Sequence, residues 1–253
     1  MTEARAIYTL WLREVKRYFR ERVRPISSFV QPALWLLIFG SGFGAAGVVR
    51  SLPIPYQEFL FPGIVAQTML FTSMFMGISI IWDREFGFLK EILVAPVSRS
   101  SIFIGKMFGN STDALIQGTI TFMLGFIIQV PLNLLLFLIA LPLMVILTFG
   151  LVCIGLSIAS TMSSLESFGV IQSFVTLPIF FTSGALFPMS AAPAWLQAVS
   201  YFNPMTYGVD ALRTIVLGGV LPSQFPLFID ILVIGAFDIG MMILGTYLFG
   251  RRK

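Results

Sequence analysis

The stretch LNLLLFLIALPLMVILTFGLVCIGLSIAS, residues 132–160, contains no charged side chain. A transmembrane helix needs about 20 consecutive apolar residues, so this stretch is long enough to cross a bilayer. The rest of the chain has the same character, because 57% of its 253 residues are hydrophobic and only 11% are charged. A soluble domain typically carries about 25% charged residues. The sequence therefore predicts an all-α protein that crosses the membrane several times.

Stretches with few or no charged residues recur along the chain and predict six transmembrane helices. We expect these helices at residues 26–49, 59–81, 107–130, 132–160, 168–187 and 227–249. Together they leave no room for a sizeable soluble domain. Residues 1–253 are therefore predicted to form a single transmembrane domain.

The basic residues predict the orientation of these helices. Six spans place both termini on one side of the membrane, and that side collects 14 of the 16 Lys and Arg residues. Cytoplasmic loops carry an excess of Lys and Arg, so both termini are predicted to be cytoplasmic. The net charge of +4 follows from this asymmetry. No nucleic-acid partner is expected.

Residues 1–25 are polar and basic, and they predict an amphipathic helix in the membrane interface. Apolar residues recur at three- and four-residue spacing on one face, at Ile7, Trp11, Val15 and Tyr18, while Arg and Lys residues occupy the other face. This pattern is typical of a helix that lies in the plane of the interface. The alternative is a segment that serves only as a positive topology anchor.

The cytoplasmic connection at residues 82–106 mixes charged and large apolar residues. It predicts a short helix from Arg84 to about Val94, which Asp83 caps and Pro96 helps to end. Its apolar stripe is expected to contain Phe86, Leu89, Ile92 and Leu93. The stripe can pack against the protein's own helix ends, or it can dock a separate cytoplasmic subunit.

Residues 188–226 form a long external segment that is too broken to span the membrane. Pro193 starts one short helix at about 194–201, and Asn203-Pro204 starts a second, with Asn as N-cap and Pro at the first helical position. Gly218-Gly219 is expected to end the second helix. Two re-entrant helices are predicted, which form either a static lid or part of an outer gate. On the second helix, Asp210 and Arg213 are three residues apart and are expected to pair.

Two local motifs carry a resemblance to a known family. REFGFLKEILVAPVSR, residues 84–99, ends in a Pro-x-Ser-Arg turn, and SGALFP, residues 183–188, is followed by NPMTYGVDALR, residues 203–213. With the predicted order of helices, these motifs resemble the permease subunit of type-2 ABC exporters over essentially the whole chain. Among the subgroups, the chain is most similar to the drug-resistance and nodulation-factor type permeases.

The resemblance implies an exporter in a prokaryotic plasma (inner) membrane, built from a homodimer of permeases. Each copy would bind a nucleotide-binding ATPase subunit that holds ATP and Mg, and this chain itself would be neither an enzyme nor a cofactor-binding subunit. The chain contains no Gly-x-x-x-x-Gly-Lys-Ser/Thr phosphate-binding loop. The residues expected to couple to the ATPase subunit are Arg84, Glu85, Phe86, Leu89, Lys90, Glu91, Leu93, Pro96 and Arg99. Those expected at the external gate are Ser183, Gly184, Phe187, Pro188, Asn203, Pro204, Tyr207, Asp210 and Arg213.

Three carboxylates fall within or near the predicted spans. Asp238 lies near the middle of the last span, where an ionisable residue is a candidate functional site. It is expected either to be a neutral group hydrogen-bonded to a neighbouring helix or to face the transport path. Asp113 and Glu166 lie near the cytoplasmic ends of their spans, and structural or conformational roles are expected for them.

Two other classes of function compete with the exporter. An ion-coupled secondary transporter would use Asp238 to carry a proton, but no inverted repeat is recognisable in the sequence. A membrane-embedded enzyme would need convergent catalytic groups, yet the chain has no His and a single Cys, and no catalytic or metal site is expected. The expected substrate of the exporter is an amphipathic drug, lipid or glycolipid-like molecule, and the aromatic residues, with 26 Phe against 4 Trp and 6 Tyr, favour a hydrophobic drug or lipid-like molecule.

Overall fold

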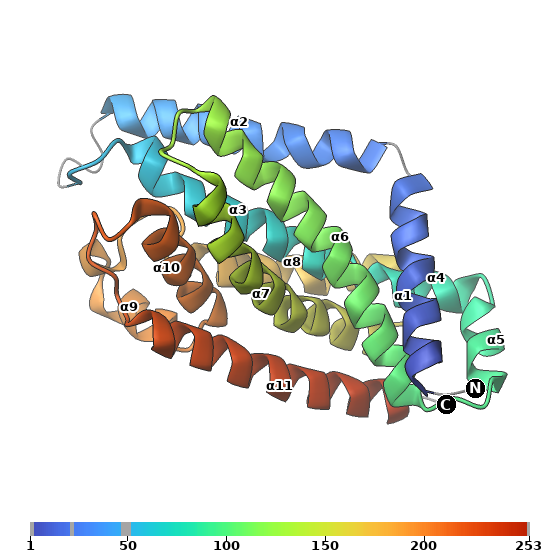
Figure 1. The fold of residues 1–253 in the computed structure, drawn as a ribbon. Helices are drawn as coiled ribbons and strands as arrows, with labels where there is room; N and C mark the ends of the chain where they lie inside the picture. Colours follow the sequence, from blue (N-terminus) through green and yellow to red (C-terminus); the bar gives the residue numbers. More distant parts are fainter. Residues whose placement is uncertain (1–2, 21–22, 47–51, 252–253) are drawn as a thin grey trace.

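The computed structural model describes residues 3–20, 23–46 and 52–251, and within these ranges the chain is helical without any β-strand (Figure 1). The elements are α1 Glu3–Arg20, α2 Val23–Ala46, α3 Tyr56–Phe75, α4 Ile78–Glu85, α5 Phe88–Val94, α6 Arg99–Ile127, α7 Leu134–Thr161, α8 Leu165–Phe181, the 3-10 turn η1 Met189–Ala191, α9 Ala194–Ser200, α10 Pro204–Leu217 and α11 Leu227–Arg251.

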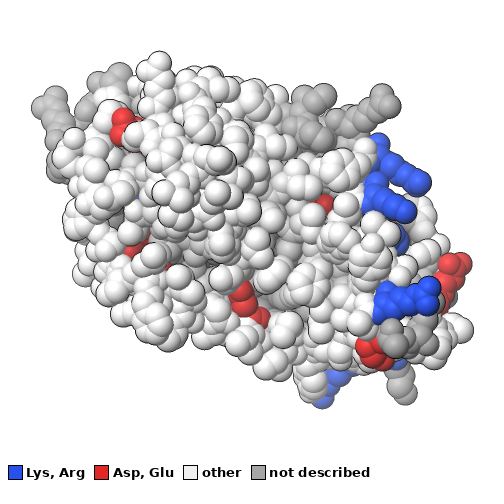
Figure 2. All heavy atoms as spheres, in the orientation of Figure 1, with Lys and Arg blue, Asp and Glu red and all other residues white. Residues whose placement is uncertain are grey.

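The long helices run side by side in an elongated bundle with two distinct ends (Figure 1). One end carries α1, α5 and both chain termini, and we call it the terminal end. The other end carries α9, and we call it the opposite end. Lys and Arg side chains gather at the terminal end on the face shown in Figure 2. This charge distribution agrees with the asymmetry read from the sequence.

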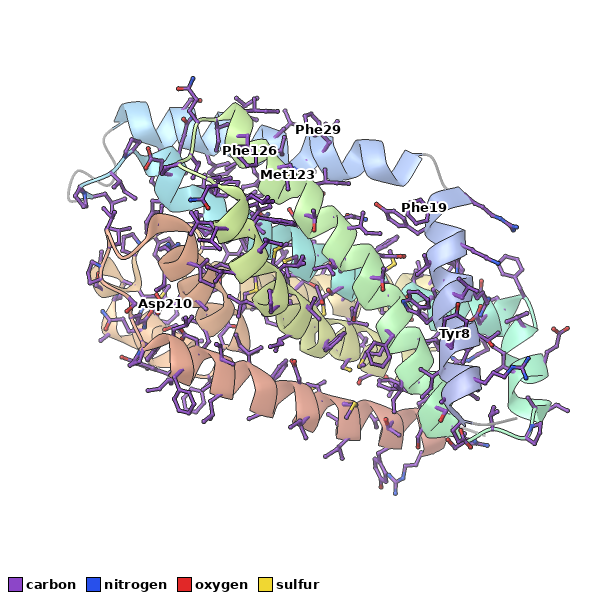
Figure 3. The ribbon with its side chains drawn as sticks, viewed as in Figure 1. Tyr8, Phe19, Phe29, Met123, Phe126 and Asp210 are labelled. Carbon is purple, nitrogen blue, oxygen red and sulfur yellow. The ribbon has the colours of Figure 1, made fainter. Side chains whose placement is uncertain are left out.

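Three helical stretches of the described chain are long and apolar enough to cross a membrane, namely Tyr56–Glu85, Leu134–Thr161 and Leu227–Arg251. Two shorter apolar helical stretches, Phe29–Gly44 and Leu165–Phe181, accompany them. The outward faces are apolar as well. Phe29, Met123 and Phe126 point away from the bundle, and their exposed fractions lie between 40% and 50% (Figure 3). Such exposure suits a surface that contacts lipid chains rather than water.

Close helix contacts in the core depend on small residues. Where the joint between α3 and α4 crosses α7, a Cβ at Gly77 would collide with the backbone of Gly155, and a Cβ at Gly155 would lie 2.7 Å from the carbonyl oxygen of Met74. Apolar helices in a lipid environment associate largely through van der Waals packing, which small residues favour by letting backbones approach. The buried core therefore extends across α3, α6, α7 and α10.

The first helix packs along α6, and its buried face differs from the predicted one. Its buried residues are Ala6, Leu10, Glu14 and Tyr18, whereas Ile7, Trp11 and Val15 are only partly buried. Two glycines of α6 allow the contact, because a Cβ at Gly105 would lie 2.9 Å from Leu10 Cβ and one at Gly109 would lie 2.5 Å from Glu14 Cβ. Residues 23–25, which the sequence assigned to this helix, instead begin α2.

The predicted helix from Arg84 to Val94 is wrong as a single element. Helix α4 continues to Glu85, Gly87 takes a left-handed conformation with φ of 76°, and α5 then begins at Phe88. Only glycine adopts this conformation without a steric penalty, so Gly87 separates the two helices. Asp83 lies inside α4 and is not an N-cap. The next helix begins at Arg99, with Ser98 as its N-cap, well before the predicted start at residue 107.

Candidate functional site

A buried network of charged side chains joins three helices at the terminal end. Lys106 of α6 is completely buried, and its ammonium group contacts the carboxylate of Asp83 on α4. Arg13 of α1 forms an ion pair with the same carboxylate, and its NH1 donates to Asp83 Oδ2 at 3.1 Å. Lys106 Nζ also lies 3.4 Å from Glu14 Oε1. Arg17 also pairs with Glu14, at 3.9 Å, so three basic groups surround the buried carboxylates of Asp83 and Glu14.

Cation–π contacts extend this network to α5. The guanidinium carbon of Arg13 lies 3.9 Å from the ring centroid of Phe88, and that of Arg17 lies 4.5 Å from the ring of Trp82. Burial lowers the pKa of Arg13, but its hydrogen bond and charge pairing with Asp83 outweigh that effect and leave the pKa raised. Arg13 therefore stays charged and holds α1 against both α4 and α5.

Hydrogen bonds attach other residues of the 82–106 connection to neighbouring elements. Glu3 accepts hydrogen bonds from the backbone N–H of Ser98 at 3.1 Å and from its hydroxyl at 3.0 Å. Arg99 donates to the carbonyl of Gly250 at 2.6 Å, and Arg84 donates to the carbonyl of Met162. The connection is therefore fastened to α1, to α11 and to the end of α7, so these elements are mechanically linked.

The predicted coupling residues divide into exposed and attached groups. Phe86 and Val94 are 83% and 86% exposed, and Phe88 is 36% exposed, so we call these three residues the α5 surface. Ile92 instead packs into the core cluster between α4, α6 and α7, as the alternative interpretation of the stripe expected. Glu85, Glu91, Pro96 and Arg99 are exposed, and Arg84 is half-buried. The side chains of Leu89, Lys90 and Leu93 lie outside the described part of the structure.

At the opposite end, Asn203 joins α8 to α10. Its side-chain oxygen accepts from the Met205 N–H at 2.9 Å, which confirms the predicted N-cap. Its amide nitrogen donates to the Ile179 carbonyl at 2.6 Å and to Thr182 Oγ1 at 2.8 Å. Pro204 occupies the first position of α10, and Gly218 ends this helix with φ of 58°. The local signals in residues 203–218 therefore predicted this helix correctly.

The expected pair between Asp210 and Arg213 is wrong. Asp210 accepts from the backbone N–H groups of Gln224 at 3.1 Å and Phe225 at 2.9 Å, so it shapes the loop before α11. Arg213 donates to the carbonyl of Gly184 at 3.0 Å and lies over the ring of Phe59 at 4.0 Å. Each group has found backbone partners from a distant segment. These contacts connect α10 to two different loops.

The SGALFP turn is held by hydrogen bonds from several helices. Ser183 Oγ donates to the Phe180 carbonyl at 2.7 Å, and Tyr56 OH of α3 donates to the Leu186 carbonyl at 2.7 Å. Gly184 has φ of 75°, and Phe187 and Pro188 are half-buried. Nearby, the hydroxyl of Tyr207 donates to the Tyr201 carbonyl at 2.8 Å. The structure thus brings the predicted gate residues together at one end of the bundle.

The three carboxylates that the sequence placed within or near predicted spans occupy different environments. Asp238 on α11 is half-buried against α7, where a Cβ at Gly150 would collide with its carboxylate, and its Oδ1 has no hydrogen-bond partner within the described structure. Asp113 is buried on α6, and Glu166 is exposed in the first turn of α8. The three groups do not form one site. Asp230, which the sequence reasoning missed, is fully buried in the first turn of α11.

The fold defines a class of protein, a helical membrane protein, and its described residues include no group of His, Cys, Asp or Glu side chains that could hold a metal ion. The sequence model of the family described as ABC-2 type transporter matches residues 5–217. The chain therefore belongs to the ABC-2 type transporter family. The match ends at the last residue of α10, so α11 with Asp238 lies outside it.

Curated relatives agree with this assignment. The chain is 33% identical to the transport permease ycf38 of Cyanophora paradoxa over 209 residues, which cover 79% of this chain and 71% of the relative. It is 27% identical to nodulation protein J of Rhizobium leguminosarum bv. viciae, with 76% and 74% covered. It is 30% identical to the multidrug ABC transporter permease YbhR of Escherichia coli K12, with 65% and 45% covered. The resemblance seen in the sequence is thus confirmed, and the chain is a transmembrane permease subunit of the ABC transporter class, which associates with an ABC ATPase subunit.

Proposed function

We propose that two copies of this chain form the transmembrane part of an exporter that moves an amphipathic drug, lipid or glycolipid-like molecule out of the cytoplasm or inner leaflet. A separate ATPase subunit would hold ATP and Mg and would dock on the α5 surface. In this proposal, six spans cross a prokaryotic plasma membrane with both termini in the cytoplasm. The family assignment and the name of one relative, a multidrug ABC transporter permease, support the transport of a drug-like molecule.

One observation carries the coupling proposal, the exposure of the α5 surface directly beside the buried ion network. Phe86 and Val94 expose most of their apolar surface at the terminal end. Phe88, the third residue of the α5 surface, lies under the guanidinium group of Arg13. That group is hydrogen-bonded to Asp83 on α4. Because a cation–π contact links α5 to α1, and ion pairs link α1 to α4 and α6, a push on the α5 surface would displace these helices together.

The contacts at the opposite end support a gate made by α9, α10 and residues 183–188. Asn203 links α10 to α8, and Arg213 links α10 to Gly184. Separation of the helices would break these few polar contacts while each helix stayed intact. An ion-coupled transporter is the alternative function, and the half-buried Asp238 with an unpartnered Oδ1 is the observation that favours it.

The docking proposal is tested by placing a charge on the α5 surface. The variants Phe86→Asp and Val94→Asp are each co-expressed with the ABC ATPase subunit of the same transport system. Co-purification of the ATPase and its substrate-stimulated ATP hydrolysis are then measured. Both variants should lose co-purification because an aspartate cannot be buried in an apolar interface without a partner.

A matched control is Phe202→Asp, which changes a residue of the opposite end that is 91% exposed. This control should retain the ATPase subunit, and all variants should insert into the membrane at the wild-type level. Normal co-purification of both α5-surface variants would contradict the docking proposal. Native mass measurement of the purified complex tests the homodimer, and a fully active complex with one permease copy would contradict it.

A further inference from the structure

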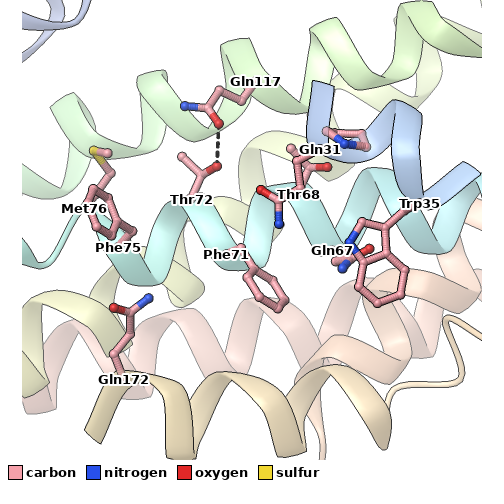
Figure 4. A pocket seen from close by; sticks show the side chains of 11 residues that line it. Gln31, Trp35, Gln67, Thr68, Phe71, Thr72, Phe75, Met76, Gln117 and Gln172 are labelled. Carbon is pink, nitrogen blue, oxygen red and sulfur yellow. Dashed lines mark hydrogen bonds between the residues drawn. The ribbon is translucent and has the colours of Figure 1, made fainter. Parts of the chain in front are cut away.

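A cleft of about 280 Å³ lies between α2, α3, α6 and α8 (Figure 4). Glutamines from four different helices contribute to its wall: Gln31, Gln67, Gln117 and Gln172. Thr68 and Thr72 add two hydroxyl groups. Polar side chains are costly in the hydrocarbon region and tend to serve a function there, so four glutamines around one cleft call for a ligand.

Gln67 provides the strongest sign of such a ligand. Its side chain is only 3% exposed, and neither Nε2 nor Oε1 has a hydrogen-bond partner among the residues that the structure describes. A buried amide without hydrogen-bond partners is energetically costly, and a bound molecule that forms those hydrogen bonds would remove the cost. Because the carboxamide has donor and acceptor atoms, it can bind a hydroxyl or amide group in either direction.

A second polar position lies on the α6 side of the cleft. Thr72 Oγ1 donates to Gln117 Oε1 at 2.7 Å (Figure 4). Gln117 is only half-buried, and the two groups come from neighbouring helices. This bond orients the Gln117 carboxamide at the wall of the cleft. The cleft therefore holds one oriented amide, that of Gln117, and one buried amide, that of Gln67, which has no partner in the described part of the chain.

Aromatic side chains provide the apolar wall. Trp35 of α2 lines the cleft and packs edge-on against Phe180 of α8, with ring centroids 5.7 Å apart. Phe71 also lines the cleft and packs edge-on against the same Phe180 ring at 5.9 Å. Phe75 adds a further ring. Flat apolar faces beside amide groups match a ligand that is itself amphipathic.

The charge of the ligand follows from what the wall contains. None of the described residues that line the cleft is ionisable. A charged group held here would lose its hydration without gaining a counter-charge, and this is strongly unfavourable. We propose that the cleft binds an uncharged amphiphile through hydroxyl or amide groups, with Gln67 as its main hydrogen-bonding residue. This inference rests on the proposed function only in treating the bound molecule as the transported one.

The test uses the full chain in lipid nanodiscs without the ATPase subunit. Three alkyl probes carry the same brominated chain and differ in their head groups, which are β-glucoside, trimethylammonium and sulfate. Bromine quenches tryptophan on contact, and the part of the quenching that is lost in Trp35→Phe reports occupancy of the cleft. The glucoside should quench Trp35 saturably, and half-saturation should need at least about fivefold less probe than for either charged head group.

The hydrogen-bonding role is tested on one residue with a matched control. Gln67→Leu should raise the glucoside concentration at half-saturation about five- to tenfold, as expected for the loss of one or two hydrogen bonds. Gln57→Leu is the same substitution on the same helix outside the cleft, and it should leave binding unchanged. Gln67→Asn keeps the polarity but shortens the side chain, so it should weaken binding even if the Leu variant does not fold.

Equal quenching by the three head groups would overturn the inference, as would unchanged glucoside binding in the Gln67 variants. These outcomes are separate from the proposed function, because binding is measured without ATP or the ATPase subunit. Loss of ATPase co-purification in the α5-surface experiment leaves this test unaffected. Conversely, a complex that transports normally but shows no preference for the glucoside would refute the proposed ligand binding in the cleft and leave the proposed exporter function standing.

Discussion

Replacing Lys106 by methionine tests whether the buried ion network stabilises the terminal end. Lys106 is completely buried, and the side chain of Asp83 is only 4% exposed. Removing one partner of a buried ion pair costs about 3–5 kcal/mol, because the other charge is left uncompensated. Asp83 keeps Arg13 as a partner in this variant, so we expect the lower end of that range, about 3 kcal/mol.

A double-mutant cycle separates the pair from its surroundings. Asp83→Asn leaves Lys106 with Glu14 at 3.4 Å and the Ser79 carbonyl at 3.5 Å, and it should cost about 2–3 kcal/mol. The double variant removes both charges, so its cost should fall below the sum of the single costs by about 2 kcal/mol. Such a coupling energy would show that the interaction between Lys106 and Asp83 itself stabilises the fold.

The assay is titration of the purified chain with a denaturing detergent in mixed micelles, followed by tryptophan fluorescence. Lys16→Met is the control, because Lys16 is exposed on α1 and its replacement should change the free energy of unfolding by no more than about 0.5 kcal/mol. Single costs that add within about 0.5 kcal/mol would refute the reasoning, as would a Lys106→Met cost equal to that of the control.

Two further predictions concern the opposite end and the start of the chain. Asn203→Ala removes an N-cap and two further hydrogen bonds, so it should lower the free energy of unfolding by about 2–3 kcal/mol in the same titration. Gln197→Ala removes a single hydrogen bond, the one to the Ala192 carbonyl. A loss of unfolding free energy as large as that of Asn203→Ala would contradict the prediction that Asn203 stabilises the fold through several hydrogen bonds. The Ser101 and Ser98 groups lower the pKa of Glu3 from its ordinary 4.5, so its stabilising effect is present above that pH and is lost as the pH falls through the lower folded value. The difference in melting temperature between wild type and Glu3→Gln should therefore be seen at neutral pH and shrink below pH 4.5, and a difference that stays constant would contradict this assignment.

The helix ends that sequence reasoning predicted well depend on local chemistry. Asn203, Pro204 and Gly218 start and end α10 through hydrogen bonds and backbone angles that involve only neighbouring residues. Such signals are readable because the partner groups are set by position along the chain. The uncharged stretch at 132–160 is readable for a similar reason, since its length and composition alone demand a lipid or core environment.

The charged loop at 82–106 was harder to predict because its partners are distant. Arg13 and Asp83 are 70 residues apart, and no spacing rule relates them. Lys106 was assigned to a cytoplasmic connection, because a lysine beside a predicted span normally reaches water. Its burial depends on Asp83 and Glu14, which arrive from two other helices.

The motifs of the amino-acid sequence indicated the permease family, and its composition by itself determined that this is a helical membrane protein. Composition and periodicity suffice for that, because bilayer thickness and backbone hydrogen bonding leave few alternatives for an apolar chain. Only the tertiary structure decided which polar groups meet. It placed Lys106 with Asp83, directed the hydrogen bonds of Asp210 and Arg213 to two different loops, and left the Gln67 amide without a hydrogen-bond partner among the described residues. These pairings depend on how the helices rotate and cross in the folded protein. Small residues such as Gly77 and Gly155 help to fix that crossing, because they let two helix backbones approach each other.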